Sequence, residues 1–143
     1  MSTDTDRRRV IFVCTHNSAR SQMAEGMLRA WGGDCFEALS AGTEATRVRP
    51  EAVAAMEEIG IDISAHASKT LEPFLGQSFA WLITVCDQAR EACPTLPGID
   101  QQLHWSIEDP SGVEGDQAKR MAAFRDARDD LANRVRAFIE GEA

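Results

Sequence analysis

The sequence has no tyrosine, few aromatic residues (6%) and no long apolar run. Its longest apolar stretch, residues 79–86, is far shorter than the roughly 18–20 residues of a membrane helix, so we expect no membrane span. Basic residues are also scarce. Fifteen Lys and Arg against 23 Asp and Glu give a net charge of −8, which disfavours binding to a nucleic-acid backbone. An anionic substrate would therefore need a site that is locally positive against the overall field.

No secretory signal is expected either, because the apolar segment after residues 7–9 is too short and no small-residue cleavage site follows it. We therefore expect a cytoplasmic protein, in which thiols stay reduced. Its four cysteines, Cys14, Cys35, Cys86 and Cys93, then indicate chemistry or metal binding rather than a disulfide framework. Cys35 is interpreted as a small buried hydrophobe on a strand.

The 143 residues predict a flexible polar segment over residues 1–8 and a single domain over residues 9–143. Strands are predicted over residues 9–14, 35–41, 79–86 and 103–105. Helices are predicted over residues 21–30, from Pro50 to Gly60 with an apolar stripe of Val53, Met56 and Ile59, and from Gly115 onward. This alternation predicts an α/β fold, a mostly parallel sheet with helices on both sides, whose ligands bind beyond the carboxyl ends of the strands.

A Cys-x5-Arg pattern, Cys14 to Arg20, begins where the first strand ends and finishes where a helix begins. Such a turn points successive backbone N–H groups inward at the positive end of a helix dipole, which makes a cradle for a tetrahedral oxyanion. It should also favour the nucleophilic thiolate of Cys14. Asn17 suits a left-handed position in a loop without glycine. The competing interpretation is a structural cysteine at a strand end with Arg20 on a surface helix. The predicted oxyanion-binding residues are Thr15, His16, Asn17, Ser18, Ala19, Arg20 and Ser21.

Cys86 and Cys93 are seven residues apart, a spacing that fits neither a Cys-x2-Cys redox motif nor a zinc ribbon. On a helix their Cα atoms would lie about 10.5 Å apart, beyond the roughly 7 Å that a disulfide allows, so forming the bond would unwind the helix. In a sheet of order 2-1-3-4, Cys86 would face the same crevice as Cys14. The alternative is two unrelated cysteines in an alanine-rich helix.

Five segments together resemble the thioredoxin-coupled arsenate reductases, a family built on the low-molecular-weight protein tyrosine phosphatase fold. They are CTHNSARSQMAE (14–25), SAG (40–42), GID (60–62), CDQAREACP (86–94), and HW (104–105) with DP (109–110). The resemblance implies a three-layer fold with a four-stranded parallel sheet of order 2-1-3-4. It also implies an enzyme of arsenic detoxification that binds no cofactor. The sequence does not indicate an oligomeric state, and a monomer is the default expectation.

By this resemblance, Cys14 attacks arsenate held by the loop amides and Arg20, and Asp109 protonates the leaving oxygen. Cys86 then attacks Cys14, arsenite leaves, and Cys93 resolves the Cys14–Cys86 disulfide into Cys86–Cys93. Thioredoxin, supplied with electrons from NADPH by thioredoxin reductase, reduces that bond. Phosphate or sulfate would occupy the loop as analogues of arsenate.

Relatives that bind potassium use residues matching Asn17, Glu25 and Ser40 together with an aspartate, which is Lys69 here. Lys69 is therefore expected to replace the cation and orient Asn17, and no metal site is predicted. With Ser21, these residues form the expected support of the loop.

Two other functions fit parts of the pattern. A phosphatase would need only Cys14, Arg20 and Asp109, and weak phosphatase activity is expected beside the reductase. A metal-binding sensor is disfavoured by the cysteine spacing and the acidic charge. Glu108 lies one place too early for the general acid, and His66 is expected at the surface.

Overall fold

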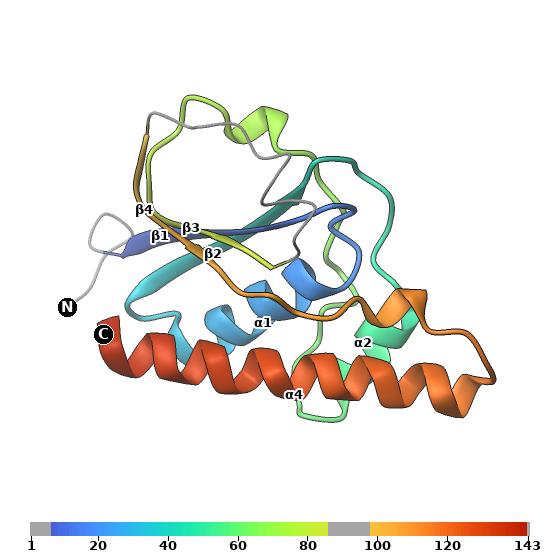
Figure 1. Cartoon of the computed structure of the whole chain (residues 1–143). Coiled ribbons are helices and arrows are strands. Elements are labelled where there is room, and N and C mark those ends of the chain that lie inside the picture. Colours follow the sequence, from blue (N-terminus) through green and yellow to red (C-terminus); the bar gives the residue numbers. More distant parts are fainter. Residues whose placement is uncertain (1–6, 86–97, 143) are drawn as a thin grey trace.

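The computed structural model describes residues 7–85 and 98–142, arranged as a parallel sheet with helices packed against it (Figure 1). The predicted positions Cys86 and Cys93 lie outside the described residues. The elements are β1 (Arg8–Cys14), α1 (Arg20–Gly32), β2 (Phe36–Gly42), α2 (Pro50–Glu57), the 3-10 turn η1 (Glu72–Phe74), β3 (Phe79–Thr84), β4 (Ile99–His104), the 3-10 turn η2 (Pro110–Gly112) and α4 (Gln117–Glu142).

The sheet has the order β2-β1-β3-β4 with every pair parallel, which confirms the predicted topology. Register places Cys14 of β1 beside Gly42 of β2, and Thr84 of β3 beside both Val13 and His104. Because all four strands run the same way, the segments that follow them meet at one edge of the sheet. This edge carries the candidate site.

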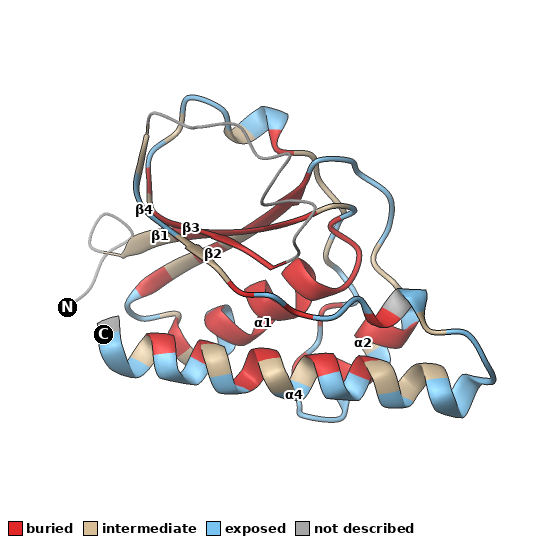
Figure 2. Ribbon diagram, viewed as in Figure 1, coloured by how far each residue is buried: buried red, intermediate tan, exposed pale blue. Residues whose placement is uncertain are grey.

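The central strands β1 and β3 are buried along almost their whole length, as expected for strands covered on both faces (Figure 2). The described helices α1, α2 and α4 lie together on one side of the sheet in Figure 1. The sequence also predicts helices on the other face of the sheet. This remains a prediction, because residues 86–97, which follow β3, are not described. None of the described helices is apolar enough over a sufficient length to cross a membrane.

The closing helix α4 buries one apolar stripe: Phe124, Leu131, Val135 and Phe138 are buried, while Met121 is partly buried. Figure 2 shows the opposite side of α4 exposed to solvent. The Phe138 ring contacts Trp81 and Phe36 from two strands at centroid distances of 5.3 Å each, so this helix is anchored to the sheet by aromatic packing.

Three local predictions were wrong. Cys35 is exposed, because β2 begins only at Phe36 and Cys35 belongs to the turn before it. Ile59 is 37% exposed, because α2 ends at Glu57 and its buried side is formed by alanines and Met56. The edge strand β4 is longer than expected, since pairing with β3 begins at Ile99 rather than near residue 103.

Candidate functional site

The 14–20 loop runs from the end of β1 to the start of α1. Asn17 has a φ of 49°, the left-handed conformation that its side chain was expected to permit. The loop packs directly on the end of β2. A Cβ atom at Gly42 would lie 2.7 Å from the Thr15 carbonyl oxygen and 2.8 Å from the Asn17 amide nitrogen. Glycine is therefore required where β2 supports the loop.

Carbonyl groups of the loop are hydrogen-bonded from outside. The backbone amides of residues 43, 44 and 49 donate to the carbonyl oxygens of Cys14 (3.3 Å), Thr15 (2.9 Å) and Ser18 (2.8 Å). The hydroxyls of Thr46 and Ser68 donate to the His16 carbonyl at 3.2 and 2.9 Å. With its carbonyls held on the outer side, the loop presents its amides to the inner side, as an oxyanion cradle requires.

The backbone amides of loop residues 16–19 are available to bind a ligand. Within the described residues, the backbone N–H groups of His16, Asn17, Ser18 and Ala19 donate to no protein acceptor. Asn17, Ser18 and Ala19 are buried, and unpaired buried amides are rare in folded proteins. Together with the start of α1, they favour an anion at the centre of the loop.

The Cys14 thiol is 2% exposed and accepts a hydrogen bond from the Ser21 hydroxyl at 3.4 Å. The Asn17 side-chain amide donates to Ser21 Oγ at 2.8 Å and to Ser40 Oγ at 3.0 Å. Ser40 in turn donates to Glu25 Oε1 at 2.7 Å. The structure thus brings together every described residue that the sequence assigned to the support of the loop.

Glu25, 3% exposed, is the charged centre of this support. Its carboxylate lies 2.8 Å from the Arg29 guanidinium and 3.8 Å from the Lys69 ammonium. The ammonium is not what orients Asn17. The backbone N–H of Lys69 donates to Asn17 Oδ1 at 2.8 Å, whereas its Nζ donates to the Ala67 carbonyl. Lys69 thus supplies charge to Glu25 and a backbone donor to Asn17.

His66 is not the isolated surface residue that the sequence suggested, since its side chain is only 12% exposed. Arg29 donates to His66 Nε2 at 3.1 Å, so Nδ1 carries the proton and donates to Gln22 Oε1 at 3.0 Å. Gln22 Nε2 then donates to Asn17 Oδ1 at 2.9 Å. Burial lowers the pKa of His66. The Glu25 carboxylate opposes this shift and the charges of Arg29 and Lys69 add to it, so the neutral form is favoured.

Sequence reasoning missed Arg29, Gln22 and Ser68. The i,i+4 spacing of Glu25 and Arg29 on one helix was a usable signal, since such pairs meet on a helix surface. The contact of Ser68 with the loop joins residues 52 positions apart, and no local pattern indicates it.

Asp109 reaches the loop from the connection that follows β4. Its carboxylate lies 3.6 Å from Arg20 Nη2, and Arg20 Nη1 donates to the Ile107 carbonyl at 2.9 Å. Arg20 is buried, whereas the Asp109 side chain is 48% exposed and can meet a ligand at the mouth of the loop. Among the described residues, the structure therefore joins Cys14, Arg20 and Asp109 at one edge of the sheet.

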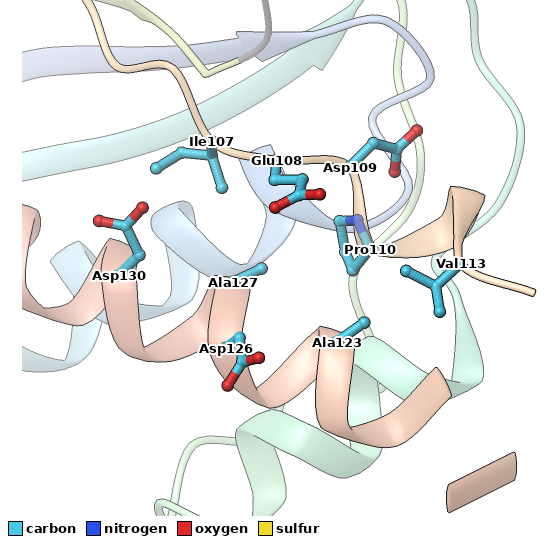
Figure 3. Close-up of a pocket in the computed structure, with 9 residues that line it drawn as sticks. All are labelled: Ile107, Glu108, Asp109, Pro110, Val113, Ala123, Asp126, Ala127 and Asp130. Carbon is cyan, nitrogen blue, oxygen red and sulfur yellow. The ribbon is translucent and has the colours of Figure 1, made fainter. Parts of the chain in front are cut away.

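Glu108 and Asp109 both line a cavity of about 300 Å³ between this connection and α4. Figure 3 shows the Asp109 carboxylate directed away from α4, unlike that of Glu108. Asp126 and Asp130 line the same cavity, so its charge is unsuited to an oxyanion. Asp109 is the better placed carboxylate for chemistry at the loop.

Comparison with known proteins agrees with this geometry. Residues 9–142 match the family described as low molecular weight phosphotyrosine protein phosphatase. An arsenate reductase of Halalkalibacterium halodurans is 42% identical over 135 residues, which cover 94% of this chain and 97% of the relative. The predicted resemblance to arsenate reductases of this fold is thereby confirmed.

Two solved structures are similar over nearly the whole chain. An arsenate reductase in the phosphate binding state has a TM-score of 0.79 and 34% identity, covering 95% of this chain and 99% of that one. A thioredoxin-dependent arsenate reductase of Corynebacterium glutamicum has a TM-score of 0.74 and 26% identity, covering 97% of this chain and 63% of that one. The chain belongs to the low molecular weight phosphotyrosine protein phosphatase family and, within it, to the arsenate reductases.

Proposed function

We propose that this protein reduces arsenate to arsenite by a relay of three cysteines that thioredoxin regenerates. The observation that carries the proposal is the 14–20 loop, in which the amides of residues 16–19 donate to no protein acceptor among the described residues and the Cys14 thiol accepts a hydrogen bond from Ser21. Its relatives are named arsenate reductases, and one similar structure is named thioredoxin-dependent. A related structure in the phosphate binding state supports a tetrahedral oxyanion as the ligand.

In the first step, the loop amides and Arg20 bind the oxyanion, and the Cys14 thiolate attacks arsenic. A sulfur–arsenic bond forms while one arsenic–oxygen bond breaks. Asp109 donates a proton to the departing oxygen, which leaves as water. The short path from Asp109 to Arg20 supports this role, because it puts the acid beside the group that grips the oxyanion.

In the second step, the Cys86 thiolate attacks the Cys14 sulfur. A disulfide forms, the sulfur–arsenic bond breaks, and its electron pair stays on arsenic, which leaves as arsenite. The Cys93 thiolate then attacks Cys86 and releases the Cys14 thiolate. The remaining Cys86–Cys93 disulfide is reduced by the thioredoxin dithiol, with NADPH and thioredoxin reductase as the ultimate source of electrons.

We further propose that the enzyme acts in the cytoplasm as a monomer without a bound cofactor or metal. The positive charge of Lys69 and Arg29 beside Glu25 supports a loop that needs no potassium.

A weak phosphatase activity is the second candidate. The loop, Arg20 and Asp109 are what phosphoester hydrolysis through a phosphocysteine requires, and that route needs neither Cys86 nor Cys93. Because the two reactions share their first half, they can be separated by the cysteines that each one needs.

The test is arsenate-dependent oxidation of NADPH in the presence of thioredoxin and thioredoxin reductase, measured beside hydrolysis of p-nitrophenyl phosphate. Cys14→Ser should abolish both activities. Cys86→Ser and Cys93→Ser should end turnover with thioredoxin but spare hydrolysis. The exposed Cys35 provides a matched control, and Cys35→Ser should leave both unchanged. Normal turnover of Cys93→Ser, or brisk hydrolysis without any NADPH loss in the unaltered enzyme, would contradict the relay.

A further inference from the structure

Two arginines, Arg47 and Arg49, lie beside the mouth of the 14–20 loop. With His16, Ser18 and Thr46 they line an open cavity of about 290 Å³. Arg47 is exposed and Arg49 is half-buried. Their segment is fixed to the loop, because the Arg49 amide donates to the Ser18 carbonyl at 2.8 Å and the Thr46 hydroxyl donates to the His16 carbonyl. The positions of both arginines are therefore set by the loop itself.

Neither of these two arginines forms an ion pair in the described part of the chain. In residues 7–85 and 98–142, neither guanidinium meets a carboxylate, a carbonyl or an aromatic ring. Every other arginine of these residues has such a partner, for example Glu37 for Arg9, Asp130 for Arg134 and the Trp31 ring for Arg136.

Carboxylates near this cavity are already engaged. Glu51, two residues after Arg49, is held by Arg120. Burial alone would raise the pKa of Glu51, but hydrogen bonds from its own backbone and from Arg120, with the charges of Arg120 and Arg49, outweigh burial, and the pKa is lowered. Glu44 lies 3.5 Å from the His16 ring and forms no ion pair with either arginine. Within the described residues, Arg47 and Arg49 thus have no ion-pair partner, and their positive charge is available at the cavity that they line.

This local charge acts against the field of the whole protein. The net charge of −8 repels a dianion at long range, and a site for a dianion must reverse the sign of the potential near its mouth. Arg20 is too deep to do this alone, since it is 8% exposed and engaged with Ile107 and Asp109. Exposed charges at the mouth act over about one Debye length, roughly 10 Å in 0.1 M salt.

We propose that Arg47 and Arg49 form a cationic rim that draws the tetrahedral dianion into the 14–20 loop. This role deepens the proposed function, from which it takes the oxyanion as the ligand of the loop. The rim arginines touch no reacting atom, so they set the capture of the substrate and not the rate of the chemical steps.

The first measurement is binding of inorganic phosphate, which needs no relay. In a chain with Cys35, Cys86 and Cys93 changed to serine, phosphate should protect Cys14 from alkylation by iodoacetamide, a neutral reagent that the rim does not attract. In R47Q/R49Q, protection at about 20 mM ionic strength should need about tenfold more phosphate. At about 0.5 M salt the difference should fall below about twofold.

The second measurement is arsenate reduction with thioredoxin by the enzyme that retains all its cysteines. R47Q/R49Q should lower kcat/KM for arsenate about tenfold at low salt and leave kcat unchanged. R47K/R49K keeps both charges and should stay close to the unaltered enzyme. R125Q/R134Q removes the same charge from ion pairs on α4 and should change neither measurement.

Each contrary result has a clear meaning. An equal loss of phosphate protection or of kcat/KM in R125Q/R134Q would show that the net charge of the protein, and not the position of Arg47 and Arg49, governs capture of the anion. A loss that persists at high salt, or one shared by R47K/R49K, would make these arginines structural and overturn the proposal. If phosphate protection depends on the arginines but the unaltered enzyme does not reduce arsenate, the relay fails and the rim stands.

Discussion

Two of the carboxylates that pair with two cations have different surroundings, one under the 14–20 loop and one on the surface. Glu25 lies between Arg29 and Lys69 at 2.8 and 3.8 Å and is 3% exposed. Glu58 lies between Arg125 and Arg128 at 2.7 and 2.8 Å, and its side chain is 39% exposed. The two groups share their chemistry but differ in their access to water.

This difference decides what each cluster can do. Water screens the Glu58 group, so its ion pairs contribute little to stability despite good distances. Glu25 is removed from water and connected through Ser40 to Asn17, so disturbing its charge disturbs the loop as well. Both carboxylates have two cationic partners, so the number of ion pairs does not separate them. Burial and the hydrogen bonds to the loop are what allow Glu25, and not Glu58, to support the loop.

The largest effect is expected from Glu25→Gln. It would weaken the hydrogen bond that Ser40 donates to the buried carboxylate and remove the ion pairs with Arg29 and Lys69, at a cost of about 3 kcal/mol in the free energy of unfolding. Urea denaturation at pH 7 measures this cost, and the KM for arsenate should rise because the loop loses its support. A cost no larger than that of Glu58→Gln would show that burial does not distinguish the two clusters.

Lys69→Asp is expected to have the next largest effect. It removes a cation beside Glu25 and adds a like charge, so we expect a loss of about 2 kcal/mol in sodium salt. Potassium at about 0.1 M should restore part of this stability in the variant and none in the unaltered protein. Thermal unfolding in matched sodium and potassium salts tests both statements. Stabilisation of the unaltered protein by potassium would contradict the replacement of the cation by Lys69.

His66 is expected to make stability depend on pH. Because burial lowers its pKa below the ordinary value of 6.5, the unfolded chain binds more protons than the folded one between those two values. Stability should therefore fall as the pH is lowered through and below 6.5. His66→Gln should remove this slope while keeping a polar group beside Gln22. The free energy of unfolding is measured by urea denaturation between pH 7 and pH 5.5. The same slope in His66→Gln as in the unaltered protein would contradict the assignment to His66.

The smallest effect is expected at Glu58. Hydrogen bonds from Arg125 and Arg128 lower its pKa from 4.5 to about 2. Its contribution is complete above pH 4.5 and is lost as the pH falls toward about 2. Glu58→Gln should flatten the stability curve in this acidic window and change little at pH 7. The carboxylate titration can be followed directly by NMR, and a pKa near 4.5 would show that the arginines do not hold it.

Much of the site was readable in the sequence because its parts are neighbours along the chain. The strand before Cys14, the helix from Arg20 and the left-handed Asn17 all follow from local patterns of burial, helical spacing and backbone preference. The parallel order of the sheet followed from the alternation of elements and from the resemblance to a family.

Local patterns were less reliable at the ends of elements. Cys35 and Ile59 lie one or two residues outside β2 and α2, and an apolar residue just beyond an element need not be buried. His66 shows the opposite case, since its partners Gln22 and Arg29 come from a helix more than 35 residues earlier.

By itself, therefore, the sequence determined which residues form the loop and the strand and helix on either side of it, because these depend on patterns among near neighbours. Tertiary structure alone decided what holds and surrounds the loop: the backbone donor of Lys69, the hydroxyls of Thr46 and Ser68, and the arginines at its mouth. These contacts join residues about 30 to 50 positions apart, and their geometry exists only after the strands have paired and brought their carboxyl ends together.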